Sequence, residues 1–266
     1  MKKSICLLVL ALLSSSFALA QKEYEMVVKK TDGTEIVTNV EDIAQIYFRE
    51  QSGSSKRVVK ITQSGTSSIF TDEFTYDSQG RVIKIVGKKN GNKDFEEEYI
   101  YSETLIICNH TYYNSSGSTS TSVTRYVVDN GRIVSERSQN SDSDKYTYTY
   151  DSDGRLSSVI VASETSKAKE VVWKNGNIVK IGSRNFEYGN LSWCNPIGFT
   201  LKGSNMEGAL VISGYYGNMP KNMPTMCLNG ESGSVTTYEY STSGGVIVMV
   251  TITEGDDIDV ATIEWN

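Results

Sequence analysis

A recurring unit of about two dozen residues constrains this chain more than any other feature. Residues 74–85 read FTYDSQGRVIKI, and residues 148–159 read YTYDSDGRLSSV. Weaker copies occur at residues 99–107, 126–134, 172–181 and 238–248. Gly131, Gly154 and Gly176 follow one another at intervals of 23 and 22 residues. A repeat of this kind predicts one supersecondary element, formed again and again and packed side by side.

Each unit is predicted to be a β-hairpin. Its Asp-x-x-Gly step favours a type I turn, because Asp accepts backbone N–H bonds and Gly takes the left-handed conformation that a following bulge needs. Tyrosine alternates with threonine over residues 146–150, which is the period of a strand. The expected turn residues are Asp77, Gly80, Gly131, Asp151, Gly154 and Gly176. The fold class is therefore all-β, an antiparallel meander of about 12 to 16 strands in one large curled sheet or barrel.

Segments outside the repeat divide the chain. Residues 1–20 have a basic start, an apolar stretch and a small-residue end, which is typical of a signal peptide cleaved after Ala20. Residues 21–50 are predicted to form a small N-terminal β-hairpin segment, and residues 51–56 a linker. The β-repeat domain is then expected to span residues 57–266.

The region 195–230 interrupts the repeat and holds all three prolines of the chain. We expect it to be an irregular excursion or plug with a short helix, and such loops often carry binding residues. Aromatic rings there and on the strand 146–150 could stack on a sugar or peptide. The possible ligand contacts are Tyr215, Tyr216, Asn218, Tyr146, Tyr148 and Tyr150. Ordinary cross-strand packing is the stronger interpretation of these tyrosines.

Charge and cysteine content limit the partners and the chemistry. Removal of Lys2 and Lys3 with the signal peptide leaves 24 basic against 32 acidic residues, which disfavours a nucleic-acid partner. We expect export to the periplasm, the outer-membrane surface or the extracellular medium. Cys108, Cys194 and Cys227 remain, and an odd number allows one disulfide with one thiol left over, without indicating the pair.

The sequence contains no recognisable catalytic set. His110 is the only histidine, so a multi-histidine zinc site is excluded, and we interpret His110 as an ordinary strand or loop residue. The acidic pair Asp151 and Asp153 and the run at 254–259 could supply oxygen ligands to calcium. Because residues 77–80 form the same turn with one carboxylate, hairpin chemistry explains these turns without a metal. No cofactor and no enzymatic activity are predicted.

The repeat units resemble the YD (RHS-type) repeat over roughly residues 70–190. Together with FEYGN at residues 186–190 and GYYGNMPKNMP at residues 214–224, they resemble more closely an uncharacterised family of proteins exported by Gram-negative anaerobes, described as a domain of unknown function with a porin-like β fold. This resemblance covers most of residues 57–266 and implies a fold and a compartment, but no catalytic residues. The shell that YD repeats build in large toxins does not transfer to so short a chain.

Three functional hypotheses follow. The first is an exported, non-enzymatic binding or scaffold protein whose ligand is a glycan, a peptide or another envelope protein. The second is an outer-membrane β-barrel, which needs strands of about 9 to 11 residues with an apolar lipid-facing band. Hydroxyl and charged residues at 121–125 and 146–150 interrupt such a band. The third is a hydrolase acting on glycans or peptides, for which no motif is present.

Overall fold

The computed structural model describes two compact units, one within residues 1–55 and one spanning residues 56–266. The described residues are 25–29, 34–39, 56–65, 67–163, 168–194 and 201–266. The predicted signal peptide and residues 51–55 of the predicted linker lie outside them. In the first unit, β1 (Glu25–Lys29) pairs antiparallel with β2 (Glu35–Asn39) as a two-stranded sheet.

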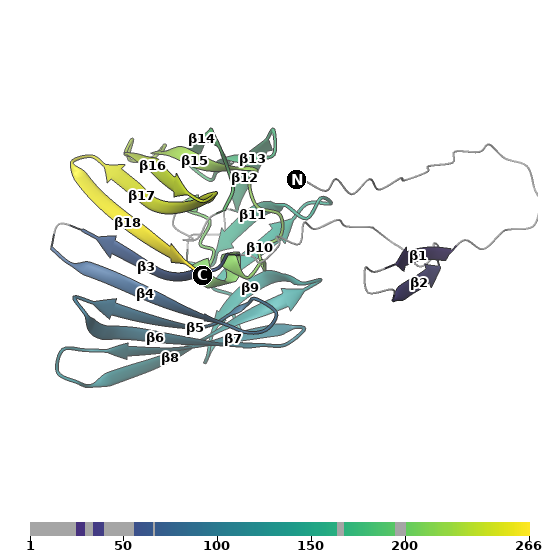
Figure 1. Ribbon diagram of the computed structural model, residues 1–266, viewed down its shortest axis with the longest axis horizontal. Helices are drawn as coiled ribbons and strands as arrows, with labels where there is room; N and C mark the ends of the chain where they lie inside the picture. The colour runs from purple at the N-terminus through teal and green to yellow at the C-terminus, as the bar shows by residue number, and fades with distance from the viewer. Residues whose placement is uncertain (1–24, 30–33, 40–55, 66, 164–167, 195–200) are drawn as a thin grey trace, which may run out of the picture. The chain divides into compact units, whose positions relative to one another are not determined.

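The second unit is a closed barrel of 16 antiparallel strands, β3 to β18 (Figure 1). The strands are β3 (Val58–Ser64), β4 (Ile69–Tyr76), β5 (Val82–Lys89), β6 (Asn92–Tyr101), β7 (Leu105–Tyr113), β8 (Thr119–Asp129), β9 (Arg132–Ser138), β10 (Tyr146–Tyr150), β11 (Leu156–Val161), β12 (Lys169–Lys174), β13 (Asn177–Ile181), β14 (Arg184–Ser192), β15 (Asn222–Asn229), β16 (Val235–Ser243), β17 (Val246–Glu254) and β18 (Asp257–Trp265). Each strand pairs with its neighbour in sequence, and β18 closes the barrel against β3. The predicted all-β meander is confirmed, and it closes.

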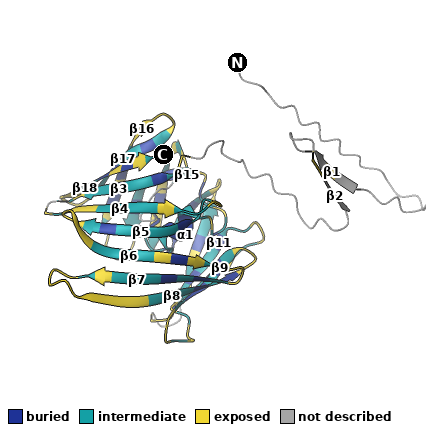
Figure 2. Cartoon of the chain, turned by 60° about the horizontal axis from the view of Figure 1, so that its bottom comes forward, coloured by how far each residue is buried: buried dark blue, intermediate teal, exposed yellow. Residues whose placement is uncertain are grey.

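The strands alternate between a buried inner face and a polar outer face. On β10, Tyr148 is only 2% exposed, whereas its neighbour Thr149 is exposed and bonds the hydroxyls of Ser157 and Ser158 on β11. Figure 2 shows buried positions recurring along the strands and exposed ones at the loops, including the tip of the β7–β8 hairpin. This two-residue period places one face of every strand in the barrel interior.

The turns with the Asp-x-x-Gly pattern share one set of hydrogen bonds. In each, the aspartate carbonyl accepts a bond from the glycine N–H, and the carboxylate accepts bonds from the arginine that follows. Gly80 and Gly154 have φ of 82° and 74°, the left-handed region that the following bulge needs. These two turns join β4 to β5 and β10 to β11 and have the geometry expected from the pattern.

The Asn-Gly turns differ from the expected type I geometry. Asn130 and Gly131 both have positive φ, 49° and 72°, and so do Asn175 and Gly176, at 53° and 79°. Two consecutive left-handed residues define the two-residue type I′ hairpin turn, in which asparagine tolerates the first position. The glycines at 131 and 176 therefore lie at bends, but in a tighter loop than the Asp-x-x-Gly pattern predicts.

A tether between aromatic side chains and the backbone explains why the unit recurs. A tyrosine hydroxyl or tryptophan N–H in one strand donates to a backbone carbonyl in an earlier strand, within the first three residues of that strand. The pairs are Tyr76 to Val58, Tyr101 to Val82, Tyr150 to Ile133, Trp173 to Leu156, Tyr188 to Ile178, Tyr240 to Pro224 and Trp265 to Ile247. In four of the seven, the arginine before the acceptor residue stacks on the same ring. The tyrosine and the Gly-Arg step of the repeat are thus the two halves of one contact.

The connection between β14 and β15 enters the barrel. We call residues 201–221 of this connection the luminal segment. It includes the one described helix, α1 (Gly208–Ile212), whose Leu210 is 0% exposed and belongs to the same hydrophobic cluster as Val82 and Tyr99 of the wall. No helix among the described residues is long and apolar enough to span a membrane.

Hydrogen bonds attach the luminal segment to both ends of the barrel. At one end, the Lys202 ammonium bonds Glu254 of β17 at 2.6 Å. At the other, the segment follows the ring of turns: Tyr215 O accepts from Ile133 N, Asn218 N donates to Gly154 O, and Lys221 N donates to Gly176 O. Backbone groups that the turns would otherwise leave to solvent are thereby satisfied by the segment.

The irregular region is shorter than the predicted 195–230, because β15 (Asn222–Asn229) is a barrel strand. Pro224, which cannot donate a ladder hydrogen bond, sits where the register between β14 and β15 shifts. Its carbonyl accepts the hydroxyl of Tyr240. A bulge therefore accommodates the proline inside the sheet, and the proline does not end the strand as the sequence suggested.

The turn aspartates make stability depend on pH. Partial burial raises the pKa of Asp151, but hydrogen bonds and the charge of Arg155 outweigh it, and the net pKa lies below its usual value. A lowered folded-state pKa contributes stability above the unfolded value of about 3.9 that is lost as pH falls through the folded value. We expect Asp151→Asn to lower stability at pH 7 by up to about 1 kcal/mol. In urea titrations from pH 7 to pH 3, the difference in unfolding free energy between Asp151→Asn and wild type should shrink as the pH falls. A difference that stays constant would contradict a lowered pKa of Asp151 in the folded protein.

Candidate functional site

A cavity of about 650 Å³ lies between the luminal segment and the wall formed by β7 to β10. The wall contributes His110 and Tyr112 from β7, Glu136 from β9 and Tyr146 from β10, while the luminal segment contributes Glu207. Most of the other lining residues carry hydroxyl or amide groups, and they are accompanied by the ammonium of Lys145 and two apolar side chains. They are Thr121, Ser122, Val123, Thr124, Tyr126, Ser138, Gln139, Asn140, Lys145, Asn205 and Met206. We call this space the luminal cavity. Its carboxylates, amides, hydroxyls and aromatic rings are groups that recognise a polar ligand.

Strand alternation places these side chains. His110 and Tyr112 are two residues apart on β7, so both face inward, and their rings stack at 6.1 Å. Tyr126 on β8 pairs with Glu136, and Glu136 pairs in turn with Tyr146 on β10, which aligns the three on one inner row. Tyr112 is 48% exposed, so its ring is available to a ligand.

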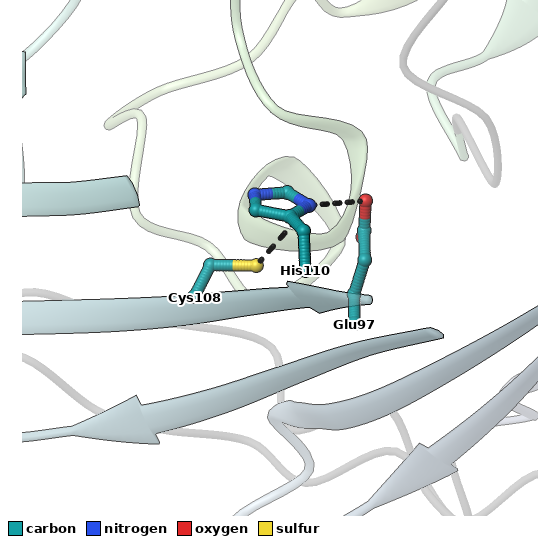
Figure 3. Close-up of side chains that lie close together, drawn as sticks. All are labelled: Glu97, Cys108 and His110. Atoms are coloured by element: carbon teal, nitrogen blue, oxygen red, sulfur yellow. Dashed lines mark hydrogen bonds and ion pairs between the residues drawn. The ribbon is translucent and has the colours of Figure 1, made fainter. Parts of the chain in front are cut away.

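Beside the cavity, three side chains with metal-ligand atoms converge (Figure 3). Glu97 of β6 lies directly opposite His110 of β7, and Cys108 precedes His110 on the same face. The Glu97 carboxylate is 3.2 Å from His110 Nδ1, and the Cys108 sulfur is 4.0 Å from the same nitrogen. All three ligand atoms lie within 4.8 Å of one another.

Acidic groups outnumber basic ones around this cluster, and burial raises the pKa of several of the carboxyl groups. Burial raises the pKa of Glu207, and the negative charge of Glu97 adds to that shift. Burial also raises the pKa of Glu136, although Lys145 opposes it at 3.1 Å. The hydrogen bond to Glu97 raises the pKa of His110. On the other side of the cluster, burial and the charge of Glu97 raise the pKa of Asp72 on β4 to about 6. This half of the lumen therefore favours a positively charged or hydrogen-bond-donating guest.

The tyrosines predicted as ligand contacts separate into two groups. Tyr146 lines the luminal cavity. Tyr148 and Tyr216 are 2% and 1% exposed and pack edge to face at 5.2 Å, so they are core residues and do not line the luminal cavity. Tyr148 also donates to Asn205 O, which fixes the luminal segment to the wall.

The other predicted contacts hold the ring of turns together. Tyr150 donates to Ile133 O, and Tyr215 stacks on Tyr101 at 5.5 Å. The Asn218 amide donates to Asp153 O, so Asn218, although exposed, uses its side chain to attach the luminal segment to the β10–β11 turn. None of these three lines the luminal cavity.

Cys108, Cys194 and Cys227 are all unpaired in the structure, so none of the three disulfide pairs that the sequence allows is formed among the described residues. Cys108 and Cys227 are buried, and burial raises the pKa of both thiols. Cys108 lies beside Glu97 and His110, two further residues with metal-ligand atoms that no sequence motif connects with it.

Comparisons with known proteins identify a family and structures that are similar to this chain. Residues 74–244, more than half of the chain, match the family described as "Domain of unknown function (DUF4595) with porin-like fold". A porin-like protein from Bacteroides uniformis ATCC 8492 is similar in structure, with a TM-score of 0.55, at 15% sequence identity over 79% of this chain and 96% of that chain. A porin-like protein from Bacteroides vulgatus ATCC 8482 gives a TM-score of 0.33 at 12% identity, over 80% and 99% of the two chains.

No curated protein matches the sequence. The structural likeness shows the barrel fold alone, and the family match starts within β4 and includes the twelve complete strands β5 to β16 together with the luminal segment. The chain belongs to the family of domains of unknown function with a porin-like fold.

Proposed function

We propose that this protein is an exported, water-soluble β-barrel that binds a neutral oligosaccharide in its luminal cavity. The observation that carries the proposal is the cavity itself, a space of about 650 Å³ with Tyr112 and Tyr146 beside carboxylate, amide and hydroxyl groups. Sugar hydroxyls both donate and accept hydrogen bonds, and the C–H face of a sugar ring packs on an aromatic side chain. The surplus of carboxylates in the lumen disfavours an anionic saccharide.

The outer face of the barrel supports a water-soluble protein over an outer-membrane barrel. Ion pairs join neighbouring strands there, Lys60 with Glu264 at 2.7 Å and Lys88 with Glu73 at 2.6 Å. In a lipid-facing wall, each lysine near the bilayer midplane would cost about 2 to 4 kcal/mol. Inside, the luminal segment fills part of the space that an aqueous channel would need.

Binding of a panel of neutral oligosaccharides, measured by calorimetry on the chain purified without detergent, tests the proposal. We expect Tyr112→Ala to weaken binding by about tenfold, which corresponds to the loss of one aromatic contact of about 1.4 kcal/mol. The single variant Glu136→Gln should also weaken oligosaccharide binding, because the amide has one acceptor oxygen where the carboxylate has two for sugar hydroxyls.

Tyr113→Ala is the matched control, because Tyr113 is the next residue on β7, faces outward and lies near Lys93. It should leave the affinity unchanged. Absence of binding across the panel, or an equal loss in the control, would reject the proposal.

Hydrolysis is the second candidate, because two carboxyl groups of raised pKa, Glu136 and Glu207, line one cavity. Glycosidases use such a pair, one as acid and one as base or nucleophile. Chromatography of the saccharide after long incubation separates the two functions. A binding protein returns it intact, whereas a hydrolase releases shorter products whose formation Glu207→Gln abolishes.

A further inference from the structure

We propose that Glu97, Cys108 and His110 form a binding site for a single Zn²⁺ ion in the barrel wall. The site is a property of the wall and does not depend on the nature of the ligand in the luminal cavity. It uses one sulfur, one nitrogen and one oxygen donor, the three donor types that zinc combines in proteins.

The sheet register builds the triad. Glu97 and His110 are direct cross-strand partners, and Cys108 pairs with Tyr99, two residues along from Glu97. Residues two apart on a strand share a face, so all three side chains project from adjacent positions of the same inner surface. A zinc ligand set here needs no loop rearrangement, because two rigid strands already hold its members.

The distances suit tetrahedral zinc. Bonds of about 2.0 to 2.3 Å at tetrahedral angles place neighbouring ligand atoms about 3.3 to 3.6 Å apart. The separations around His110 Nδ1 are 3.2 Å to the Glu97 oxygen and 4.0 Å to the Cys108 sulfur. The third separation, between the Glu97 oxygen and the Cys108 sulfur, is at most 4.8 Å. Side-chain shifts of up to about 1 Å would therefore bring the three atoms to the spacing of a zinc coordination sphere.

Contacts from neighbouring hydroxyl groups orient two of the ligands. The hydroxyl of Tyr99 donates to the other oxygen of Glu97 at 2.7 Å, which leaves the first oxygen directed at His110. His110 Nε2 lies 3.3 Å from the hydroxyl oxygen of Thr124, so the proton can reside on Nε2 while Nδ1 binds the metal. Metal-ligating histidines and carboxylates are usually held in this way.

Burial and charge fit the same interpretation. Cys108 is 0% exposed, and the side chains of His110 and Glu97 are 12% and 15% exposed. His110 also lines the luminal cavity, so water or a ligand atom can occupy the fourth coordination position. Zinc would neutralise part of the surrounding negative charge, with the thiol proton of Cys108 released to solvent on binding.

Zinc titration of the metal-free chain, kept reduced and without saccharide, tests the site. We expect one Zn²⁺ per chain by elemental analysis, and a thiolate-to-metal absorption band when Co²⁺ replaces Zn²⁺. Cys108→Ser should abolish the band and weaken zinc binding by at least about tenfold. Cys227→Ser is the matched control, since Cys227 is an equally buried thiol on β15, and it should retain both properties.

Thr124→Val keeps all three ligands and removes only the hydroxyl beside His110 Nε2, so it tests the site even if Cys108→Ser fails to fold. It should weaken zinc binding by about 10- to 100-fold. Failure of the wild-type chain to bind zinc, or a cobalt–thiolate band that persists in Cys108→Ser, would overturn the proposal. Because no saccharide is present, these outcomes are independent of the oligosaccharide measurements.

Discussion

Replacement of Leu210 by alanine is expected to lower the free energy of unfolding by about 2 to 5 kcal/mol, the range for a buried leucine truncated in a core that cannot collapse around the gap. Leu210 is 0% exposed and belongs to the cluster that joins α1 to the barrel wall. Because the wall strands are held by their ladders, they cannot move in to fill the space. Urea unfolding followed by tryptophan fluorescence measures the change.

Leu228→Ala is the control for this prediction. Leu228 lies on β15, half-buried and on the face opposite to the buried Cys227. Leu228→Ala should lower the free energy of unfolding by less than half as much, because a half-buried side chain removes less apolar surface from water on folding. A change of under 0.5 kcal/mol for Leu210→Ala, on the order of an ordinary surface substitution, would show that the luminal segment does not contribute to the core.

Gly217→Ala is expected to destabilise the barrel by about 2 to 5 kcal/mol, through backbone strain and overpacking together. Gly217 has φ of 71°, and a Cβ there would lie 2.3 Å from the carbonyl oxygen of Gly154. That oxygen accepts the N–H of Asn218, so the clash would force apart the contact that joins the luminal segment to the β10–β11 turn. Thermal unfolding followed by circular dichroism reports the loss.

Gly233→Ala separates the two contributions. Gly233 has nearly the same φ, 72°, but a Cβ there would meet no heavy atom within 4 Å. It should therefore cost only the left-handed strain of about 1 to 2 kcal/mol. Equal effects at the two glycines would mean that the close approach to Gly154 has no energetic importance.

The local structure could be predicted from the sequence because its signals are local. The turn at Asp77 and the tyrosine alternation at 146–150 each act within a few residues, and both led to the all-β meander that the structure confirms. Closure could not be predicted, because the pairing of β18 with β3 depends on the accumulated twist and stagger of the whole sheet. Pro224 misled the prediction, since a bulge that accepts proline has no signature in a single sequence.

The candidate site was largely missed. Glu97 carried a usable signal, because it alternates with Phe95 and Tyr99 and so shares their inward face. The inward position of Glu136 could not be predicted from strand alternation. The register of β8 and β9 shifts between Val127 and Val128, so inward residues of β9 no longer follow one another at intervals of two. Glu207 comes from the luminal segment, whose path through the barrel no periodicity describes. Only the fold could therefore connect these acids with His110.

The pairing of β18 with β3 has a consequence for the way the barrel forms. Lys60 and Glu264, which bond across that pairing, are 204 residues apart, so the contact closes a very long loop, whereas the other strand pairs link neighbours along the chain. Long-range pairing is slow, and until it occurs the growing sheet has two edges with unsatisfied N–H and C=O groups. The charged side chains Lys60 and Glu264 would then protect those edges from pairing with other molecules, and would become partners of each other once the cylinder is complete.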